Sequence, residues 1–241
     1  MTDTLLETST VRRHFVLHSG GLDSSTALLM CCDQNPDDQV IAVSVHYGQR
    51  HKREIELSKA LCSSRSIRHL TVDMAQPPKS MLTDPSKRVP EISYSDITGM
   101  SPTYVPFRNG QLLSRIAGIA QGWVMEGDIQ DPATREATIW FGAHAEDAHN
   151  WAYPDCTPEF VGAMANAIYI GTYHRVRLIT PFLFWKKSSI VLEGEVLGLP
   201  FELTWSCYKG EEKQCGVCMT CQARKGAFRD AAILDPTEYA R

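Results

Sequence analysis

Charge of the two signs is nearly balanced in this sequence. Its 241 residues contain 24 Lys and Arg against 28 Asp and Glu, a formal net charge of −4. Proteins that bind nucleic acid usually attract the polyanion with an excess of basic residues. We therefore expect no nucleic-acid partner, although residues 50–68 are locally basic, with six Lys or Arg against two Glu.

Long apolar runs are also missing. No run approaches the roughly 18 consecutive apolar residues that a membrane-spanning helix needs. Residues 1–13, "MTDTLLETSTVRR", lack the apolar core of a signal peptide. We expect no membrane partner, a flexible N-terminus over residues 1–13 and a cytoplasmic location.

The composition that remains is that of an ordinary globular protein. Hydrophobic residues make up 43% of the chain and charged residues 22%, which argues against disorder along most of its length. A chain of this length fits one α/β domain with a sizeable core. We find no internal repeat that would indicate a second large domain.

Short apolar runs alternate with stretches of helical periodicity. The runs at 14–18, 39–45 and 138–142 are rich in β-branched or aromatic residues, and each predicts a buried strand. Helical periodicity marks 24–33, 50–63, 108–125 and 158–170. This alternation predicts a doubly wound, mainly parallel sheet with helices on both faces. The proline-rich stretch 74–103 predicts a long loop, of the kind that often forms a lid or a binding loop.

The turn "SGGLDSS" follows the first predicted strand. Gly20 and Gly21 have no Cβ, so the backbone there can approach a phosphate closely, and the Ser19 and Ser24 hydroxyls add donors. A tight turn with Asp23 or Ser24 capping the next helix is the simpler alternative. Neither the Walker A pattern nor the dinucleotide fingerprint is present.

Four of the eight cysteines crowd into "CYKGEEKQCGVCMTC". Cys215, Cys218 and Cys221 have C-x-x-C-x-x-C spacing, and Cys207 lies eight residues upstream, which allows four thiolates to converge on one zinc ion. A closed shell of this kind would be structural. An iron–sulfur cluster also uses four thiolates, and a redox thiol is a third reading.

The stretch S-G-G-x-D-S after a first strand resembles the pyrophosphate loop of the ATP pyrophosphatase (PP-loop) superfamily, whose members adenylate a carbonyl oxygen. The resemblance implies an adenine nucleotide alpha hydrolase-like fold and a loop that binds the β and γ phosphates of ATP, with Asp23 near Mg²⁺. The implied ATP-binding residues are His18, Ser19, Gly20, Gly21, Leu22, Asp23, Ser24, Ser25, Thr26, Ala27 and Leu28.

Four further segments occur in a fixed order after this loop. They are "HYGQRH" at 46–51, "YVPFRNG" at 104–110, "GAHAEDAHNWAYPDCTPEF" at 142–160 and "CGVCMTCQARKGAF" at 215–228. Together with the loop they closely resemble the 7-cyano-7-deazaguanine synthase family of queuosine and deazaguanine biosynthesis. The resemblance runs from about residue 14 to residue 230.

This resemblance implies an ATP-dependent carbon–nitrogen ligase. Its substrates would be 7-carboxy-7-deazaguanine and ammonia, and its product the nitrile, formed through an adenylated acid and an adenylated amide. It also implies a homodimer, a PP-loop ATP-binding domain over 14–206, and a zinc-binding segment over 207–241. The cofactors would be ATP, Mg²⁺ and Zn²⁺, with zinc held by Cys207, Cys215, Cys218 and Cys221.

Several charged residues are candidates for handling ATP and the substrate. By the resemblance, Lys187 would neutralise the α-phosphate, unless it is a solvated residue at a helix start. Arg108 and Asn109 open a predicted helix at the ligand edge, where Arg108 would bind a phosphate or the substrate carboxylate. Arg50 and His51 are either substrate ligands or surface charges. Asp23, Lys187 and Arg108 form the predicted catalytic set.

A deazaguanine presents two adjacent N–H donors, which one carboxylate can accept as a pair. The candidates are Asp147, Asp155 and Glu159, and we favour Asp155 because Tyr153 and Pro154 could form a wall for a flat ring. An acidic loop, or the first turn of a helix starting near Thr157, is the alternative.

The sequence departs from the family pattern at a few positions. Thr157 stands where many relatives carry Arg, and Ser189 where a Glu is common, which bears on substrate preference. Three other functions stay open: an enzyme that stops at the amide or transfers the acyl group to another amine, a tRNA-modifying sulfur-inserting enzyme, and a zinc-ribbon interaction module without activity.

Overall fold

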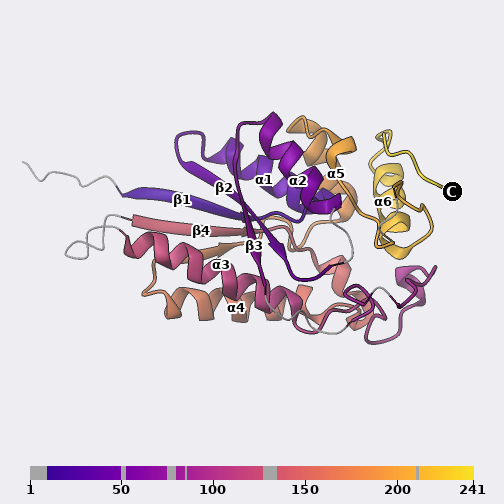
Figure 1. Ribbon diagram of the computed structural model, residues 1–241, viewed down its shortest axis with the longest axis horizontal. Coiled ribbons are helices and arrows are strands. Elements are labelled where there is room, and N and C mark those ends of the chain that lie inside the picture. The colour runs from indigo at the N-terminus through magenta and orange to yellow at the C-terminus, as the bar shows by residue number, and fades with distance from the viewer. Residues whose placement is uncertain (1–9, 50–52, 75–79, 85, 127–134, 210–211) are drawn as a thin grey trace, which may run out of the picture.

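The computed structural model describes residues 10–49, 53–74, 80–84, 86–126, 135–209 and 212–241. These residues form a central β-sheet flanked by helices (Figure 1). Among them, none of the helices combines the length and the apolar character that crossing a bilayer requires.

The described strands make one five-stranded sheet in the order β3-β2-β1-β4-β5. Every neighbouring pair is parallel. The strands are β1 (Val11–Leu17), β2 (Gln39–His46), β3 (Arg68–Asp73), β4 (Arg135–Phe141) and β5 (Val176–Ile179). Since the chain moves outward from β1 in both directions, β1 and β4 straddle the switch point where open parallel sheets bind ligands.

The central strands are buried on both faces, which explains their continuous apolar runs. Side chains alternate across the sheet. Phe15 and Leu17 of β1 pack in one core cluster with residues of the third and fourth helices, while Val16 packs in a second cluster with residues of the first helix. Each strand of the centre therefore contributes to two separate cores.

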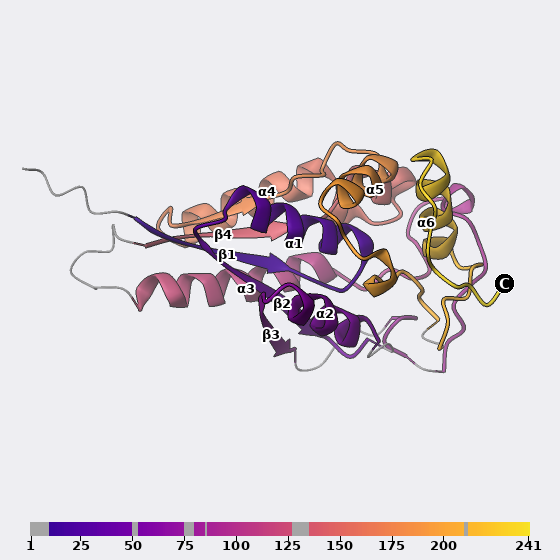
Figure 2. The same cartoon turned by 90° about the horizontal axis from the view of Figure 1, so that it is seen from above.

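Helices cover both faces of the sheet. In Figure 1, α1, α2 and α5 lie above it and α3 and α4 below. In both views α6 lies at the end of the molecule beyond the carboxyl ends of the strands (Figure 2). The bounds are α1 (Leu22–Gln34), α2 (Arg53–Ser64), α3 (Arg108–Met125), α4 (Pro158–Gly171), α5 (Lys187–Val196) and α6 (Met219–Asp230). Short 3-10 turns cover Tyr94–Asp96, Ala145–Trp151, Pro154–Cys156 and Phe201–Leu203.

The structure confirms the predicted doubly wound parallel sheet. The three predicted strands correspond to β1, β2 and β4, and the four predicted helices to α1 to α4. The periodicity of the sequence did not mark β3, β5, α5 or α6, although a helix start at Lys187, where α5 begins, was one reading of that residue. Both additional strands are at the sheet edges and only partly buried, so they lack the apolar run that marks a central strand. β1 begins at Val11, three residues before the predicted start of the domain.

Candidate active site

The loop between β1 and α1 is fixed by close backbone contacts. Gly20 has φ +82°, and a Cβ at this position would overlap the carbonyl oxygen of Glu54 in α2. Only glycine satisfies both the left-handed conformation and this close approach. The Gly20 carbonyl in turn accepts a hydrogen bond from the backbone N–H of Trp205, at 2.8 Å. The loop is therefore held between α2 and the segment that precedes the cysteines.

The serines of the loop shape its open surface. The backbone N–H of Ser19 donates to Ser24 Oγ at 3.2 Å, and the Ser24 hydroxyl donates to the Gly21 carbonyl at 3.1 Å. Ser19 itself is exposed, and with Gly21 and Ser24 it lines a cavity at the carboxyl edge of the sheet. The exposed Ser19 side chain and the backbone amides at a helix N-terminus suit an anion.

The predicted ATP-binding stretch 18–28 divides into two parts. Ser19 to Ser24 line the cavity, apart from Gly20, which is buried behind it, and His18 also borders it. Ser25 and Thr26 are buried, the former bonded to His18 Nε2 at 3.0 Å and the latter to the Leu22 carbonyl. Ala27 and Leu28 are fully buried in the core beneath α1.

A buried polar network supports the loop from below. His18 Nδ1 pairs with Ser58 Oγ at 2.7 Å, and Ser58 pairs with Ser44, whose hydroxyl donates to the His18 carbonyl at 2.6 Å. Burial lowers the pKa of His18 to about 3. This imidazole is therefore neutral at physiological pH and acts as a hydrogen-bonding support.

A charged cluster lies on the β4 side of the loop. Lys187 Nζ donates to Asp23 Oδ2 at 2.6 Å and lies 3.2 Å from His144 Nε2. The same His144 nitrogen is 3.5 Å from Asp23 and 3.6 Å from Asp147. Lys187 opens α5, where its backbone N–H donates to Glu146. The cluster thus brings together residues from α1, α5 and the segment after β4.

Mutual attraction favours the charged forms of Asp23 and Lys187. Burial opposes the carboxylate form of Asp23, but the charge of Lys187 and the contact with His144 lower the pKa of Asp23 below its usual range. Burial likewise opposes the ammonium form, but Asp23 and Asp147 raise the pKa of Lys187. Asp23 Oδ1 is buried and has no hydrogen-bond partner among the described residues, which leaves one carboxylate oxygen available to a ligand.

The start of α3 gives Asp155 a role that the sequence did not indicate. The backbone N–H of Asn109 donates to Asp155 Oδ2 at 3.0 Å, and the Asn109 amide donates to the Asp155 carbonyl at 3.1 Å. Asp155 is 4% exposed and does not line the cavity. Its carboxylate therefore occupies the N-terminus of α3 and positions Arg108, which does line the cavity.

The other predicted substrate residues are distributed unevenly. Asp147 lines the cavity. Tyr153 is buried behind it, with its hydroxyl 2.5 Å from Thr103 Oγ1. Glu159 is exposed in the first turn of α4, and Asn109 lines the cavity beside Arg108. Arg50 and His51 lie outside the described residues.

The structure adds cavity residues that sequence reasoning missed. Tyr47, Glu54, Tyr94 and Tyr208 line the same cavity. Burial raises the pKa of Glu54 to about 7, against the opposing charge of Arg108. Tyr94 comes from the proline-rich stretch that we predicted to be a lid or binding loop. Tyr47 lies within the quoted segment "HYGQRH", but nothing in its spacing pointed to it.

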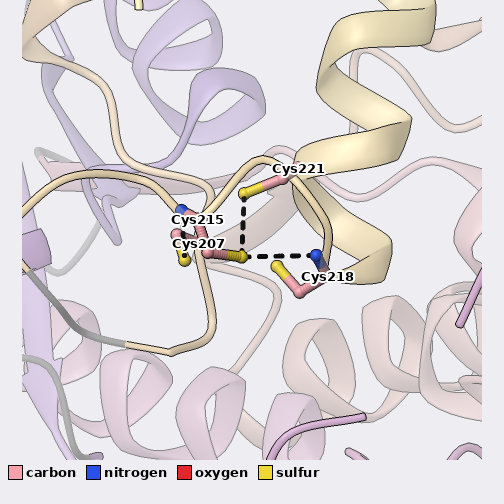
Figure 3. A group of neighbouring side chains, drawn as sticks. All are labelled: Cys207, Cys215, Cys218 and Cys221. Carbon is pink, nitrogen blue, oxygen red and sulfur yellow. Dashed lines mark hydrogen bonds between the residues drawn. The ribbon is translucent and has the colours of Figure 1, made fainter. Parts of the chain in front are cut away.

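The four clustered cysteines converge as their spacing predicts (Figure 3). All four are buried, and their sulfur atoms lie within 4.8 Å of one another. Backbone N–H groups point at the sulfurs: Cys215 N–H donates to Cys207 Sγ and Cys218 N–H to Cys215 Sγ, both at 3.3 Å. Such donors stabilise thiolates, so the cluster fits a bound metal ion.

The basic residues near the cluster are engaged elsewhere. Arg224 is fully buried and pairs with Asp235 at 3.2 Å, while Lys213 pairs with Glu238 at 2.8 Å. Lys225 lies 4.2 Å from the centre of the Tyr239 ring. Stabilisation of thiolate charge in this structure therefore comes from backbone amides and not from these side chains.

Known proteins similar to this chain match it over nearly its whole length. A 7-cyano-7-deazaguanine synthase from Caldicellulosiruptor bescii is 42% identical over 230 residues, covering 94% of this chain and 97% of the relative. One from Thermoplasma volcanium is 39% identical over 237 residues, covering 95% and 92%.

Among solved structures, one similar to this chain is the U34-tRNA thiolase NcsA from Methanococcus maripaludis with its [4Fe-4S] cluster. The match covers 92% of this chain and 68% of the thiolase chain. Its sequence identity is 15% and its TM-score 0.47. The family described as "Queuosine biosynthesis protein QueC" matches residues 13–232. This match covers most of the chain, and the chain belongs to that family.

Proposed function

We propose that this protein converts 7-carboxy-7-deazaguanine, ammonia and ATP into 7-cyano-7-deazaguanine. The observation that carries the proposal is the shared cavity at the carboxyl edge of the sheet. A phosphate-type loop, the Asp23–Lys187 pair and Arg108 all border it, and relatives that match over 90% of the chain are named for this product.

The chemistry explains why such a cavity is needed. Forming a nitrile from an acid removes both carboxyl oxygens, and oxygen leaves readily only after it carries an adenylyl group. Ser19, Gly21 and Ser24 are placed to bind the pyrophosphate of ATP, while Lys187 and Arg108 offset negative charge that develops during transfer.

Asp23 fits a magnesium site. Its Oδ1 is free of protein partners among the described residues, and one ligand atom from each of Asp23, His144 and Asp147 lies within 4.8 Å of the other two. Magnesium prefers oxygen ligands and keeps several waters. We assign Asp23 as its protein ligand, with Asp147 next to it, where the ion would neutralise phosphate charge.

Asp147 is our proposed reader of the deazaguanine edge. It lines the cavity, whereas Asp155 caps α3 and Glu159 is exposed away from the lining residues. Tyr94 and Tyr208 line the cavity too, and burial and then the Asp147 charge raise the pKa of Tyr94. A carboxylate beside two aromatic rings can accept paired N–H donors from a flat base stacked on those rings.

Zinc is the ion we propose for the cysteine cluster. A tetrahedral zinc with Zn–S bonds of about 2.3 Å places its sulfurs about 4 Å apart. Cys215 and Cys221 sulfurs are 4.0 Å apart, and all four lie within 4.8 Å. A four-iron cube would hold its thiolates farther apart, because the iron atoms stand between them. One zinc per chain and no visible absorption are the expected results of metal analysis.

Mass spectrometry of the product tests the reaction. Purified protein is incubated with 7-carboxy-7-deazaguanine, ATP, Mg²⁺ and ammonia, and the nitrile should form with two AMP released per molecule. An amide that accumulates and never advances would contradict the proposal. The homodimer and the cytoplasmic location that the sequence suggested are further proposals, which light scattering and cell fractionation test.

A further inference from the structure

Glu54 is placed where the reaction occurs, yet no part of the proposed ATP or base recognition uses it. It lies in the first turn of α2, and its backbone carbonyl packs directly against Gly20 of the phosphate loop. Glu54 also lines the cavity with Arg108, Lys187 and Asp23. The contact with Gly20 fixes this residue relative to the loop that would hold ATP.

The other two carboxylates of the cavity are already engaged. Asp23 accepts from Lys187 at 2.6 Å, and Asp147 lies 3.6 Å from the His144 nitrogen. Glu54 forms no ion pair within 4.0 Å in the described part of the chain. Among the contacts of the described residues, it is therefore the cavity carboxylate whose lone pairs are least committed to a cation.

The groups facing Glu54 come from two neighbouring elements. Arg108 at the start of α3 lowers its pKa, and the Tyr47 hydroxyl lies on the segment after β2, where the Glu54 charge helps to raise the pKa of Tyr47. Burial is the larger effect and brings the pKa of Glu54 to about 7. A group poised near neutral pH can take up a proton and release it again in every cycle.

The proposed reaction requires such cycling, because one nitrogen loses three protons. Ammonia attacks the adenylated acid, a C–N bond forms, the C–O bond to AMP breaks, and the nitrogen gives up one proton to become the amide. Adenylation of the amide oxygen removes a second proton from that nitrogen. Loss of the second AMP, with its electron pair, removes the third and leaves the nitrile.

We propose that Glu54 is the catalytic base that accepts these protons from the ammonia-derived nitrogen. This inference rests on the proposed nitrile-forming function. Each proton passes to the Glu54 carboxylate and then to solvent through the open cavity, so the residue returns to its starting state without a further reactant. Arg108 assists by keeping the carboxylate form accessible near neutral pH.

A variant that keeps shape but cannot accept a proton separates this role from ATP activation. In Glu54→Gln, exchange of pyrophosphate into ATP that depends on 7-carboxy-7-deazaguanine, measured without ammonia, should stay within about threefold of wild type. Nitrile formation should fall about 100-fold or more, the usual contribution of a general base. Glu54→Asp should recover part of that loss. Glu56→Gln, an exposed neighbour in the same helix, is the matched control and should behave as wild type.

The pH profile of the wild-type enzyme gives a second test that needs no variant. The ammonia-dependent rate, expressed per free ammonia, should rise through pH 7 as Glu54 becomes the carboxylate, while pyrophosphate exchange should not show this limb. Three results would each overturn the role of Glu54. They are a wild-type rate that does not rise through pH 7, a Glu54→Gln variant that forms nitrile at the wild-type rate, and a variant that loses pyrophosphate exchange and nitrile formation to the same extent. A wild-type protein that makes no nitrile would instead overturn the proposed function.

Discussion

The phosphate loop and the cysteine cluster are two polar centres at the same end of the sheet, built in opposite ways. The loop is open: Ser19 is exposed, and Asp23 Oδ1 lacks a partner among the described residues. The cluster is closed: its four cysteines are buried, and the sulfurs of Cys207 and Cys215 accept backbone N–H groups. An open centre suits a ligand that arrives and leaves in each cycle, whereas a closed one suits an ion that stays.

The two centres are nevertheless connected. Trp205 donates its backbone N–H to the Gly20 carbonyl, and its indole N–H donates to the Cys207 carbonyl at 2.8 Å. Ser206 and Tyr208 on either side of Cys207 line the cavity. The segment that carries the cysteine cluster therefore forms part of the cavity wall. Substitutions in the two centres should nevertheless have different effects on stability and on turnover.

Substituting a cysteine of the closed centre should have the largest effect of the variants considered, and that effect should be a loss of folding stability. Cys218→Ser removes one of four thiolates. Structural zinc contributes about 10 kcal/mol or more in isolated fingers, which is comparable with the entire stability of a domain, about 5–15 kcal/mol. We expect loss of bound metal and rapid hydrogen exchange over residues 205–241.

The control is Cys32→Ser, which changes a half-buried thiol outside the cluster. It should keep one metal per chain and unfold like wild type. Full metal content in Cys218→Ser would refute the assignment of this residue as a ligand.

Breaking the open centre should affect chemistry and largely spare the fold. Asp23→Asn keeps an oxygen that can accept from Lys187 but removes the negative charge. We expect turnover to fall by about 10³-fold, as when one group that stabilises a transition state is lost, with a thermal midpoint that changes far less than in Cys218→Ser. Turnover and calorimetry measure the two effects, and Asp33→Asn, exposed on the same helix, is the control. Unchanged turnover in Asp23→Asn would remove Asp23 from the catalytic set.

The support of the closed centre can be tested through Arg224. Its fully buried guanidinium pairs with Asp235 and also donates to Thr204 and the Phe201 carbonyl. Asp235→Asn leaves that charge uncompensated and should lower the free energy of unfolding by about 3–5 kcal/mol. Asp230→Asn, which disrupts an exposed pair with Arg229, should have little effect. Equal effects in denaturant titrations of the two variants would contradict this ranking.

The Arg224–Asp235 pair also predicts that the stability of the protein depends on pH. Burial opposes ionisation of Asp235, but hydrogen bonds and charge from Arg224 lower its pKa in the folded protein. The contribution of Asp235 to the free energy of unfolding should therefore be complete above the usual Asp pKa of about 4. It should be lost as the pH falls through the lower pKa that Asp235 has in the folded protein. Asp235→Asn should lack this acid-range component in urea titrations taken at a series of pH values.

The support of the open centre can be tested through two glycines with the same φ angle. Gly20 and Gly99 both have φ +82°, but a Cβ meets the Glu54 carbonyl only at Gly20, while Gly99 has open space. Gly20→Ala should lower the free energy of unfolding by about 1–3 kcal/mol more than Gly99→Ala, because only at Gly20 does the added methyl group overpack against a neighbour. It should also weaken ATP binding in calorimetric titrations. Matching losses in the two variants would show that the Glu54 contact does not constrain the loop.

The sequence predicted those parts of the molecule that have a local signature. The strand at 14–18 and the turn after it follow from an apolar run that stops at Gly20 and Gly21. The cysteine cluster follows from spacing, because chain geometry alone brings Cys215, Cys218 and Cys221 together. The central sheet follows in the same way, from continuous runs buried on both faces.

Other parts depend on contacts between distant segments. Asp155 looked suited to base recognition, but its partner is the backbone of Asn109, 46 residues earlier, and no spacing rule relates the two. Glu54 owes its environment to Arg108 and Gly20, which come from other elements. Edge strands β3 and β5 are short and half exposed, so their composition does not separate them from loops.

The bond from Trp205 to Gly20 also bears on when the protein becomes competent during its synthesis. The loop at residues 19–24 and its contact with Glu54 in α2 leave the ribosome early. The strand that flanks β1 on its other side, β4, comes later and pairs Arg135 with Val11, and the second contact of the loop forms only once residue 205 has emerged. The segment with the cysteine cluster, which could hold a metal ion, follows directly. A nascent chain therefore carries its phosphate loop supported on the α2 side alone for most of translation, and the proposed ATP site is completed among the last events of folding.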